Sequence, residues 1–440
     1  MLYAEILDGR DEKLFFSNLI TVRDKDVDLI RLKEVMLSGS SIRYNHSAIA
    51  RLNTPPHRAV FVVKRMFYFI IMCYMVCIRK IMNSDNIIAR ASLDNESYKT
   101  SSANTIRAKQ SWKNHIDHFE SAIFDPWYKA ITRIHSIISS QTGNFFNSKG
   151  LSPVLLPVTT GSISSPMGLG SDSMPVKINL GGVDTYLADS MQFLLEYALR
   201  LNDKGVYYLM PTFRGEEQDK RHLNQFYHAE SEIIGGLSDV IELASSYVTY
   251  LCDYFLENER NLISQFTDDT SHLIKLSNLK GDIPKVSFQK AVKLLENNPL
   301  YVRMHESGFK QITNEGEKKL IELFDGPVWL THFPKLSVPF YQADSLEDGY
   351  SLTADLLMGI GETLGAGERN TYADDVVENL KARQVGREEY EWYIRMRELM
   401  PLRTSGFGMG VERFILWLIN HDDIRDCQLL PRVHGENILP

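Results

Sequence analysis

Between residues 125 and 146 the apolar side chains recur every three or four positions, which is the spacing of one face of an α-helix. The pair Lys149-Gly150 then predicts the end of that helix. A short apolar run over 151–156 follows and stops at Pro157, so it predicts a strand. The chain therefore presents a long amphipathic helix that leads directly into a strand closed by proline.

The rest of the pattern alternates predicted strands with predicted helices. The predicted strands are 206–214, 226–234, 328–333 and 350–360, and 185–199 is predicted as a strand followed by a helix. The predicted helices are 241–261, 380–400, the part of 407–420 that follows its glycines, and a small helical insertion at about 270–325 with helices at 284–295 and 315–324. Antiparallel strands rich in polar residues and separated by helices favour an α+β fold over a doubly wound parallel sheet.

The first hundred residues differ from the rest. Residues 66–78 form an unbroken apolar run of 13 residues, whereas a membrane-spanning helix needs about 20. We expect a buried helix or strand there, with an interfacial membrane segment as the alternative. Acidic residues near the N-terminus argue against a secretory signal. The chain is expected to divide into a divergent N-terminal region, 1–105, and a second domain, 106–440.

Composition narrows the class of protein. With 440 residues, 44% hydrophobic and 24% charged, the chain is not a collagen, a coiled-coil rod or a disordered protein. Its four cysteines lack both zinc-site spacing and a disulfide framework, so we expect a reducing, cytoplasmic location. A net charge of −8 argues against a generic nucleic-acid binder. The stretch 43–80 nevertheless carries seven Lys or Arg and no acid, and is either a phosphate-facing surface or a solvated face.

A first group of candidate chemical residues spans two neighbouring predicted strands. Arg214 ends one strand, where its planar guanidinium suits bidentate contact with a phosphate. The loop pair Arg221-His222 is placed to reach more distal phosphates, and Phe226 on the returning strand can stack on a purine. Glu230 and Glu232 alternate on the same strand face as Phe226. The alternative is a salt-bridged hairpin without a ligand.

Two further groups contain glycines. Residues 406–410 place three glycines before Glu412-Arg413 at a helix start, which lets backbone approach a ligand while Arg413 points into the site. This pattern is neither a dinucleotide fingerprint nor a P-loop. Asp355, Glu362 and Arg369 are spaced seven apart with glycines between them. Two carboxylates suit Mg²⁺ held together with substrate phosphates, and the arginine suits a substrate carboxylate or carbonyl. An ordinary loop is the alternative.

Together these residues resemble the catalytic core of class II aminoacyl-tRNA synthetases. FRGEEQDKRHLNQFYHAESEI is similar to motif 2, GFGMGVERFILWL to motif 3, and the helix–strand unit ending at Pro157 to motif 1, the dimer-interface motif. The resemblance is strongest to the aspartyl/asparaginyl subgroup and covers roughly residues 115–435. The marks of that subgroup are 186–192, 339–341, 362–369, 423–426 and 431–432.

The resemblance implies an antiparallel sheet flanked by helices, a bent ATP and a homodimer. The resemblance implies that ATP is bound by Arg214, Glu216, Arg221, His222, Phe226, Glu362, Gly410 and Arg413. It implies that Mg²⁺ is bound by Asp355 and Glu362. It implies that the amino acid is bound by Ser190, Gln192, Glu196, Glu230 and Arg369. The implied reaction is attack of a carboxylate on the α-phosphate, which gives an acyl-adenylate and pyrophosphate. Arg214, Arg413 and Glu362 would promote it by positioning and charge neutralisation.

The amino-acid pocket departs from the aspartyl pattern. Aspartyl enzymes carry Lys three residues after the glutamine matching Gln192, where this chain has Leu195 followed by Glu196. Glu196 with Arg369 favours an amide or another nitrogen-bearing side chain over free aspartate, and a solvent-facing helix Glu is the alternative. Three further departures from the family are the absence of Glu in 159–172, Gly367 in place of Ser near the metal, and Thr404 in place of His.

The largest departure is at the N-terminus. Members of the family that charge tRNA carry an anticodon-binding barrel of short strands at the N-terminus. Residues 1–105 of this chain lack the alternating strands and glycine turns that such a barrel requires. The sequence therefore favours a stand-alone ligase that adenylates aspartate, asparagine or an analogue and passes the acyl group to ammonia or a small amine, with tRNA not favoured. A genuine asparaginyl- or aspartyl-tRNA synthetase with a diverged N-terminal tRNA-binding region is the first alternative. A non-catalytic regulator is the second, although retention of Arg214, Phe226, Glu362 and Arg413 argues against it.

Overall fold

The computed structural model describes residues 105–165, 173–347, 349–435 and 437–439, together with two short strands, β1 (Ile6–Leu7) and β2 (Lys13–Leu14). The chain divides into two compact units, Met1–Ser101 and Ser102–Pro440, and each is treated by itself. The predictions for the apolar run 66–78 and the basic stretch 43–80 lie outside the described residues, as does the second half of 159–172, residues 166–172.

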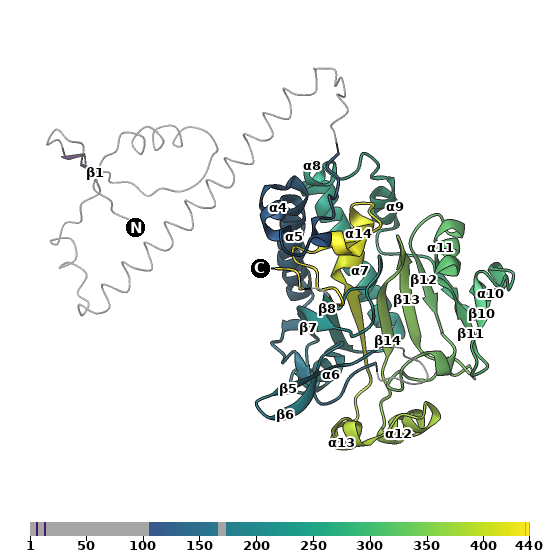
Figure 1. The fold of residues 1–440 in the computed structure, drawn as a ribbon. Helices are drawn as coiled ribbons and strands as arrows, with labels where there is room; N and C mark the ends of the chain where they lie inside the picture. Colours follow the sequence, from purple (N-terminus) through teal and green to yellow (C-terminus); the bar gives the residue numbers. More distant parts are fainter. Residues whose placement is uncertain are drawn as a thin grey trace. The chain divides into compact units, whose positions relative to one another are not determined.

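A mixed eight-stranded sheet occupies the centre of the second unit (Figure 1), in the order β3-β7-β8-β15-β14-β13-β12-β9. In that order its strands are Ser152–Pro153, Val206–Phe213, Gln225–Ile234, Thr404–Gly410, Gly361–Glu368, Thr353–Met358, Val328–Thr331 and Lys285–Ser287. The strands from β7 to β12 pair antiparallel with their neighbours, whereas the edge strands β3 and β9 pair in parallel. This arrangement confirms the predicted α+β class.

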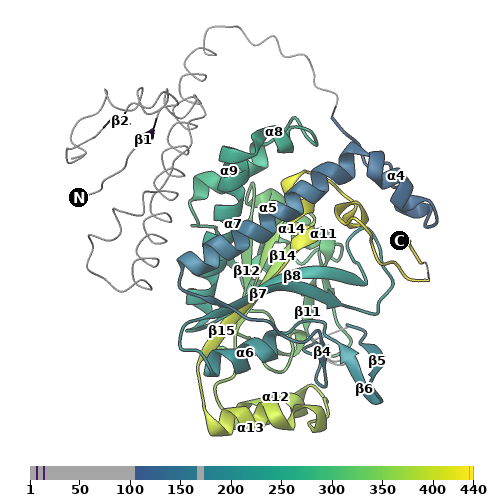
Figure 2. The same ribbon diagram turned by 90° about the vertical axis from the view of Figure 1, so that its left-hand side faces the viewer.

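Helices cover one face of this sheet. The long helix α5 (Pro126–Ser148) begins where Asp125 Oδ1 accepts a hydrogen bond from the Trp127 backbone N–H at 2.9 Å, with proline at its first position. Together with α7 (Leu237–Asn258) and α14 (Val411–Leu418) it contributes to the largest hydrophobic cluster. The helices α12 (Ala373–Ala382) and α13 (Glu391–Leu399) lie at the opposite end of this unit from α9 (Ser271–Leu279) in both views (Figures 1 and 2).

Both glycine-rich segments are strands, which the sequence did not predict: an ordinary loop was the alternative for the first, and the second was placed only before a helix start. In the middle of β14 and β15 apolar residues alternate with glycines, so one face packs into the core and the other has no side chains at the glycine positions. Gly365 lies opposite Gly408 and Gly367 opposite Gly406 in the register. These four glycines form a bare floor, which we call the glycine floor, between β8 and β13. The alternation was obscured because glycine is usually a strand breaker.

Two helical predictions were wrong in part. The predicted helix 380–400 is two helices, because the chain turns between α12 and α13 at Gln384, whose φ is 57°. The insertion contains α10 (Phe288–Leu294) and α11 (Asn314–Leu323), but also β9 and the hairpin β10–β11 (Val302–Met304, Lys310–Ile312). The strands β9, β10 and β11 have three residues each, which is too short to show the alternation of apolar and polar residues that identifies a strand in the sequence.

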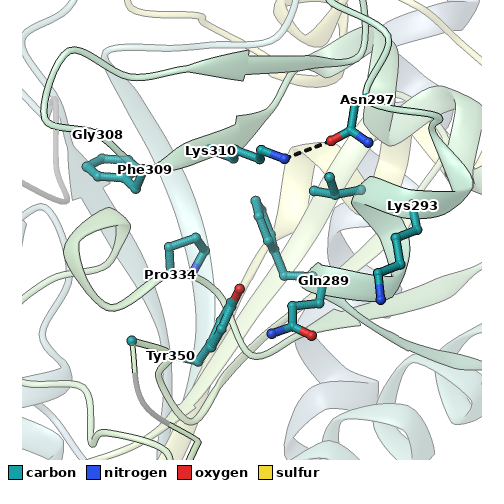
Figure 3. Close-up of a pocket in the computed structure, with 11 residues that line it drawn as sticks. Gln289, Lys293, Asn297, Gly308, Phe309, Lys310, Pro334 and Tyr350 are labelled. Atoms are coloured by element: carbon teal, nitrogen blue, oxygen red, sulfur yellow. Dashed lines mark hydrogen bonds between the residues drawn. The ribbon is translucent and has the colours of Figure 1, made fainter.

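A pocket of about 510 Å³ lies between the insertion and the residues Pro334, Gly349 and Tyr350 (Figure 3). Its walls include the rings of Phe309 and Tyr350 and the side chains of Lys293 and Lys310, and the Lys310 ammonium donates to Asn297 Oδ1 at 2.7 Å. The residues that the sequence predicts for a site lie elsewhere in the fold. In the described part of the chain, no helix is both long and apolar enough to cross a membrane.

Candidate active site

Three arginines predicted to contact phosphates converge beside the glycine floor. Arg214 directly follows β7, Arg221 lies in the β7–β8 loop, and Arg413 lies in the first turn of α14. The loop is shaped by Asn224, whose Nδ2 donates to the carbonyls of Arg214 at 3.0 Å and Glu216 at 2.6 Å. Burial lowers the pKa of Arg413; Glu362 opposes the shift, whereas the charges of Arg221 and Arg214 add to it. The three cations therefore share one small volume, as a polyphosphate site requires.

Several polar atoms in this region are buried without a protein partner. They are Arg214 Nε, Glu216 Oε2, Arg221 Nε and Asn314 Oδ1. Buried polar atoms in native proteins are nearly always hydrogen-bonded, so this concentration marks a place where a polar ligand binds. His222 belongs to the same region, because burial and the nearby Arg413 charge lower its pKa.

Phe226 lies at the start of β8 beside these arginines. Its ring centroid is 5.8 Å from the Arg214 guanidinium carbon, and it meets the His228 ring edge to face at 4.8 Å. A half-buried aromatic ring beside a guanidinium offers a face for a base next to a cation for a phosphate. This arrangement suits a purine nucleotide.

The predicted acidic pair lies at one end of the glycine floor. A Cβ atom added at Gly365 would lie 3.3 Å from Glu362 Oε1 and 3.5 Å from Asp355 Oδ1, so both carboxylates point over this glycine. Burial, with the charges of Glu362 and Glu317, raises the pKa of Asp355 well above its ordinary value. Two carboxylates held this close together repel one another and suit a hard divalent cation. In the described residues, no group of three or more His, Cys, Asp or Glu side chains could hold a metal ion.

Glu230 lies over the middle of the glycine floor. Its carboxylate accepts from Ser190 Oγ at 2.9 and 2.7 Å, and its Oε1 is 3.0 Å from His228 Nδ1. Burial acts to raise its pKa, but the interactions with His228, Tyr208 and Ser190 outweigh burial and lower the pKa of Glu230. Gln192 donates its backbone N–H to Ser190 Oγ at 3.2 Å, and its side-chain Nε2 is buried without a partner. The group offers an ionised acceptor for a substrate ammonium.

Arg369 is buried at the far end of the floor. Its Nε and Nη2 donate to the Glu232 carboxylate at 3.2 and 3.0 Å, and its Nη1 donates to Gln342 Oε1 at 3.1 Å. Burial raises the pKa of Glu232 to about 7, with Arg369 opposing the shift and Glu196 adding to it. Gly367 faces the Gln342 amide, so this departure from the family pattern lies in the Arg369 pocket and not at the acidic pair.

The structure places Glu196 away from Arg369. Its carboxylate is fully buried and accepts from the Tyr393 hydroxyl and from Arg397 Nη2, each at 2.5 Å. Glu232 occupies the position against Arg369 that the sequence prediction gave to Glu196. The alternation of Glu230 and Glu232 on one strand face was the signal that could have identified it, whereas nothing in the sequence pointed to Gln342 or Glu317.

This fold and this site define a class II synthetase-type nucleotide-binding enzyme. The family model "tRNA synthetases class II (D, K and N)" matches residues 119–434, and the chain belongs to this family. It is therefore an ATP-dependent ligase of the class II aminoacyl-tRNA synthetase type, as its motifs predicted.

The relatives place it more narrowly in the aspartyl/asparaginyl subgroup. The asparagine–tRNA ligase of Pyrococcus abyssi is 29% identical over 323 residues, which are 72% of this chain and 71% of that protein. The asparagine–tRNA ligase of Bacillus anthracis is 30% identical over 335 residues, covering 70% and 72%. The crystal structure of asparaginyl-tRNA synthetase from Pyrococcus horikoshii complexed with asparaginyl-adenylate superposes with a TM-score of 0.67 at 26% identity, covering 74% and 73%.

Proposed function

We propose that this chain activates asparagine with ATP and transfers the asparaginyl group to tRNA. Its family, and relatives that are themselves named asparagine–tRNA ligases, support this proposal over transfer to ammonia or a small amine, which the sequence had favoured. The observation that carries the choice of amino acid is the buried pairing of Arg369 with Glu232 and Gln342 at the end of the glycine floor.

This pocket complements an amide better than a carboxylate. An asparagine side chain donates through its NH₂ and accepts through its carbonyl, and Glu232 and Arg369 supply the matching acceptor and donor. An aspartate side chain would instead place a second carboxylate beside Glu232 in a buried site, where like charges repel strongly. Glu230 lies two residues before Glu232 on the same face of β8, and its carboxylate would bind the α-ammonium group of the substrate.

The cation cluster would hold ATP. The substrate carboxylate attacks the α-phosphorus, the bond to the β-phosphate oxygen breaks, and pyrophosphate leaves. Arg214 would stabilise the charge on the α-phosphate, and Arg413, Arg221 and His222 would hold the distal phosphates. Asp355 and Glu362 would hold Mg²⁺, which would supply positive charge against the phosphates. The attacking carboxylate is already ionised, so the site needs no general base.

We propose a homodimer formed through the motif 1 elements. Leu155, which follows β3 in this unit, is 98% exposed in the single chain, and Phe124, which ends the helix before α5, is 81% exposed. Large exposed apolar side chains of this kind are candidates for burial against a second copy. Leu155→Glu is expected to shift the protein toward monomer in sedimentation velocity, and an unchanged dimer would contradict this assignment.

Amino-acid-dependent ATP–pyrophosphate exchange tests the proposed activity. Asparagine should support exchange and aspartate should not, and Arg413→Ala should abolish exchange while the exposed Arg395→Ala retains it. Charge reversal at Lys64 and Arg65 in the basic stretch should reduce tRNA charging and leave exchange intact. Exchange with aspartate but not asparagine would overturn the amino-acid assignment.

A further inference from the structure

Helix α11 of the insertion reaches the ATP site, which the sequence did not indicate. Glu317, in its first turn, accepts a hydrogen bond from the backbone N–H of Glu362 at 3.2 Å. The same oxygen, Oε2, lies 3.6 Å from Arg221 Nη2. One carboxylate from the insertion therefore contacts a phosphate-binding arginine and the backbone of a proposed Mg²⁺ ligand.

The turn before Glu362 is built to admit this side chain. Gly361 has φ +133°, and a Cβ atom added there would collide with Glu317 Oε2. Asn314, at the start of the same helix, turns its buried and unpartnered Oδ1 toward the same glycine, 3.3 Å from that added Cβ. A side chain at position 361 would be strained and would push Glu317 out.

Both ends of the Glu362 residue are held by groups of the site. The Glu317 carboxylate accepts a hydrogen bond from the Glu362 backbone N–H, and Arg413 Nη1 donates to the Glu362 backbone carbonyl at 2.6 Å. A hydrogen bond that involves an ionised group is about twice as strong as a neutral one, so these contacts hold the backbone from which the Glu362 side chain extends. Both contacts of the Glu317 carboxylate go to other groups of the site, the Arg221 guanidinium and the Glu362 backbone, so they assign Glu317 to positioning.

We propose that Glu317 is a positioning residue of the ATP site, which orients Arg221 and Glu362 for the Mg²⁺-bound distal phosphates and makes the insertion part of the catalytic machinery. The inference rests on the proposed function only in taking ATP as the ligand. The competing role is a favourable charge at the helix N-terminus. Glu315, exposed in the same turn, shares that role without reaching the site and is the matched control.

The test measures ATP binding directly, by equilibrium dialysis of labelled ATP with and without Mg²⁺ on the full chain. Glu317→Ala loses both contacts and should weaken binding of ATP with Mg²⁺ by about tenfold to a hundredfold. Glu317→Gln keeps an acceptor for the Glu362 N–H and should lose less. Gly361→Ala should reproduce the ATP defect, and Glu315→Gln should bind like wild type.

A second readout separates positioning from general damage. In the exchange assay the KM for ATP should rise in Glu317→Ala while the KM for asparagine stays within about twofold, since Glu317 contacts the phosphate side only. Unchanged ATP binding in Glu317→Ala, or an equal defect in Glu315→Gln, would overturn the proposal. If wild type binds ATP but shows no exchange with asparagine, the proposed function fails and the dialysis result still decides the role of Glu317.

Discussion

The buried pair Arg369–Glu232 can be tested by removing one partner and then both. Arg369 is 3% exposed and Glu232 is fully buried, and three of the guanidinium nitrogens are engaged, two by Glu232 and one by Gln342. Arg369 opposes the burial-driven rise in the pKa of Glu232. At pH 8, Arg369→Met therefore forces Glu232 either to stay charged in the interior without its partner or to take up a proton, and both cost folding free energy.

The expected cost follows from what is left behind. Removing one partner of a buried ion pair costs about 3–5 kcal/mol, whereas replacing both by neutral groups of similar volume costs little. Arg369→Met should therefore lose about 3–5 kcal/mol of unfolding free energy at pH 8, and Arg369→Met with Glu232→Gln should recover most of it. The penalty of the single variant should shrink at pH 5, where Glu232 carries a proton.

Urea unfolding followed by tryptophan fluorescence measures these differences. Trp329 is fully buried and hydrogen-bonded to Ser245 Oγ at 2.9 Å, so its emission reports loss of the sheet core. A loss below about 1 kcal/mol for Arg369→Met, or a double variant as unstable as the sum of the singles, would refute the burial argument.

Three further outcomes follow from the site. Because the pKa of Glu232 is raised from 4.5 to about 7 in the folded chain, its contribution to stability is present below pH 4.5 and falls by up to about 3 kcal/mol as the pH rises to 7. Glu232→Gln should flatten that part of the profile of unfolding free energy against pH. Gly408→Ala places a Cβ 2.9 Å from Glu230 Oε1 and should raise the KM for asparagine by about tenfold or more, with a smaller change for ATP. Arg413→Ala should lower kcat for ATP turnover by at least about 100-fold in stopped-assay kinetics while sedimentation velocity still shows the dimer.

The sequence was sufficient where local signals and tertiary demands agree. The proline-started helix at 126, the hairpin that carries Arg214 and Phe226, and the glycines before Arg413 were all identified, because each depends on short-range pattern or on residue types with one dominant use. The α+β class followed from the order of the elements, and it did not require any boundary to be correct.

The sequence was insufficient where a residue's role depends on a partner far along the chain. Glu196 and Glu232 have the same side chain, and only the packing of α6 (Gln192–Arg200) against Arg397 and Tyr393 directs Glu196 away from Arg369. Glu317 contacts Glu362 across 45 positions, and no periodicity encodes such a contact. The glycine-containing strands β14 and β15 were missed because glycine has a low β-strand propensity. Glycine is nevertheless required beneath Glu230, where a Cβ atom at Gly408 would lie 2.9 Å from Glu230 Oε1.

The most direct test is a paired transfer assay on the full chain with ATP and Mg²⁺. One reaction contains labelled asparagine and unfractionated tRNA, and the other contains labelled aspartate and ammonium. The account predicts that label from asparagine becomes acid-precipitable with the RNA, with one AMP formed per ester, and that no asparagine forms from aspartate. Asparagine made from aspartate and ammonium, with no labelled tRNA in the first reaction, would contradict it.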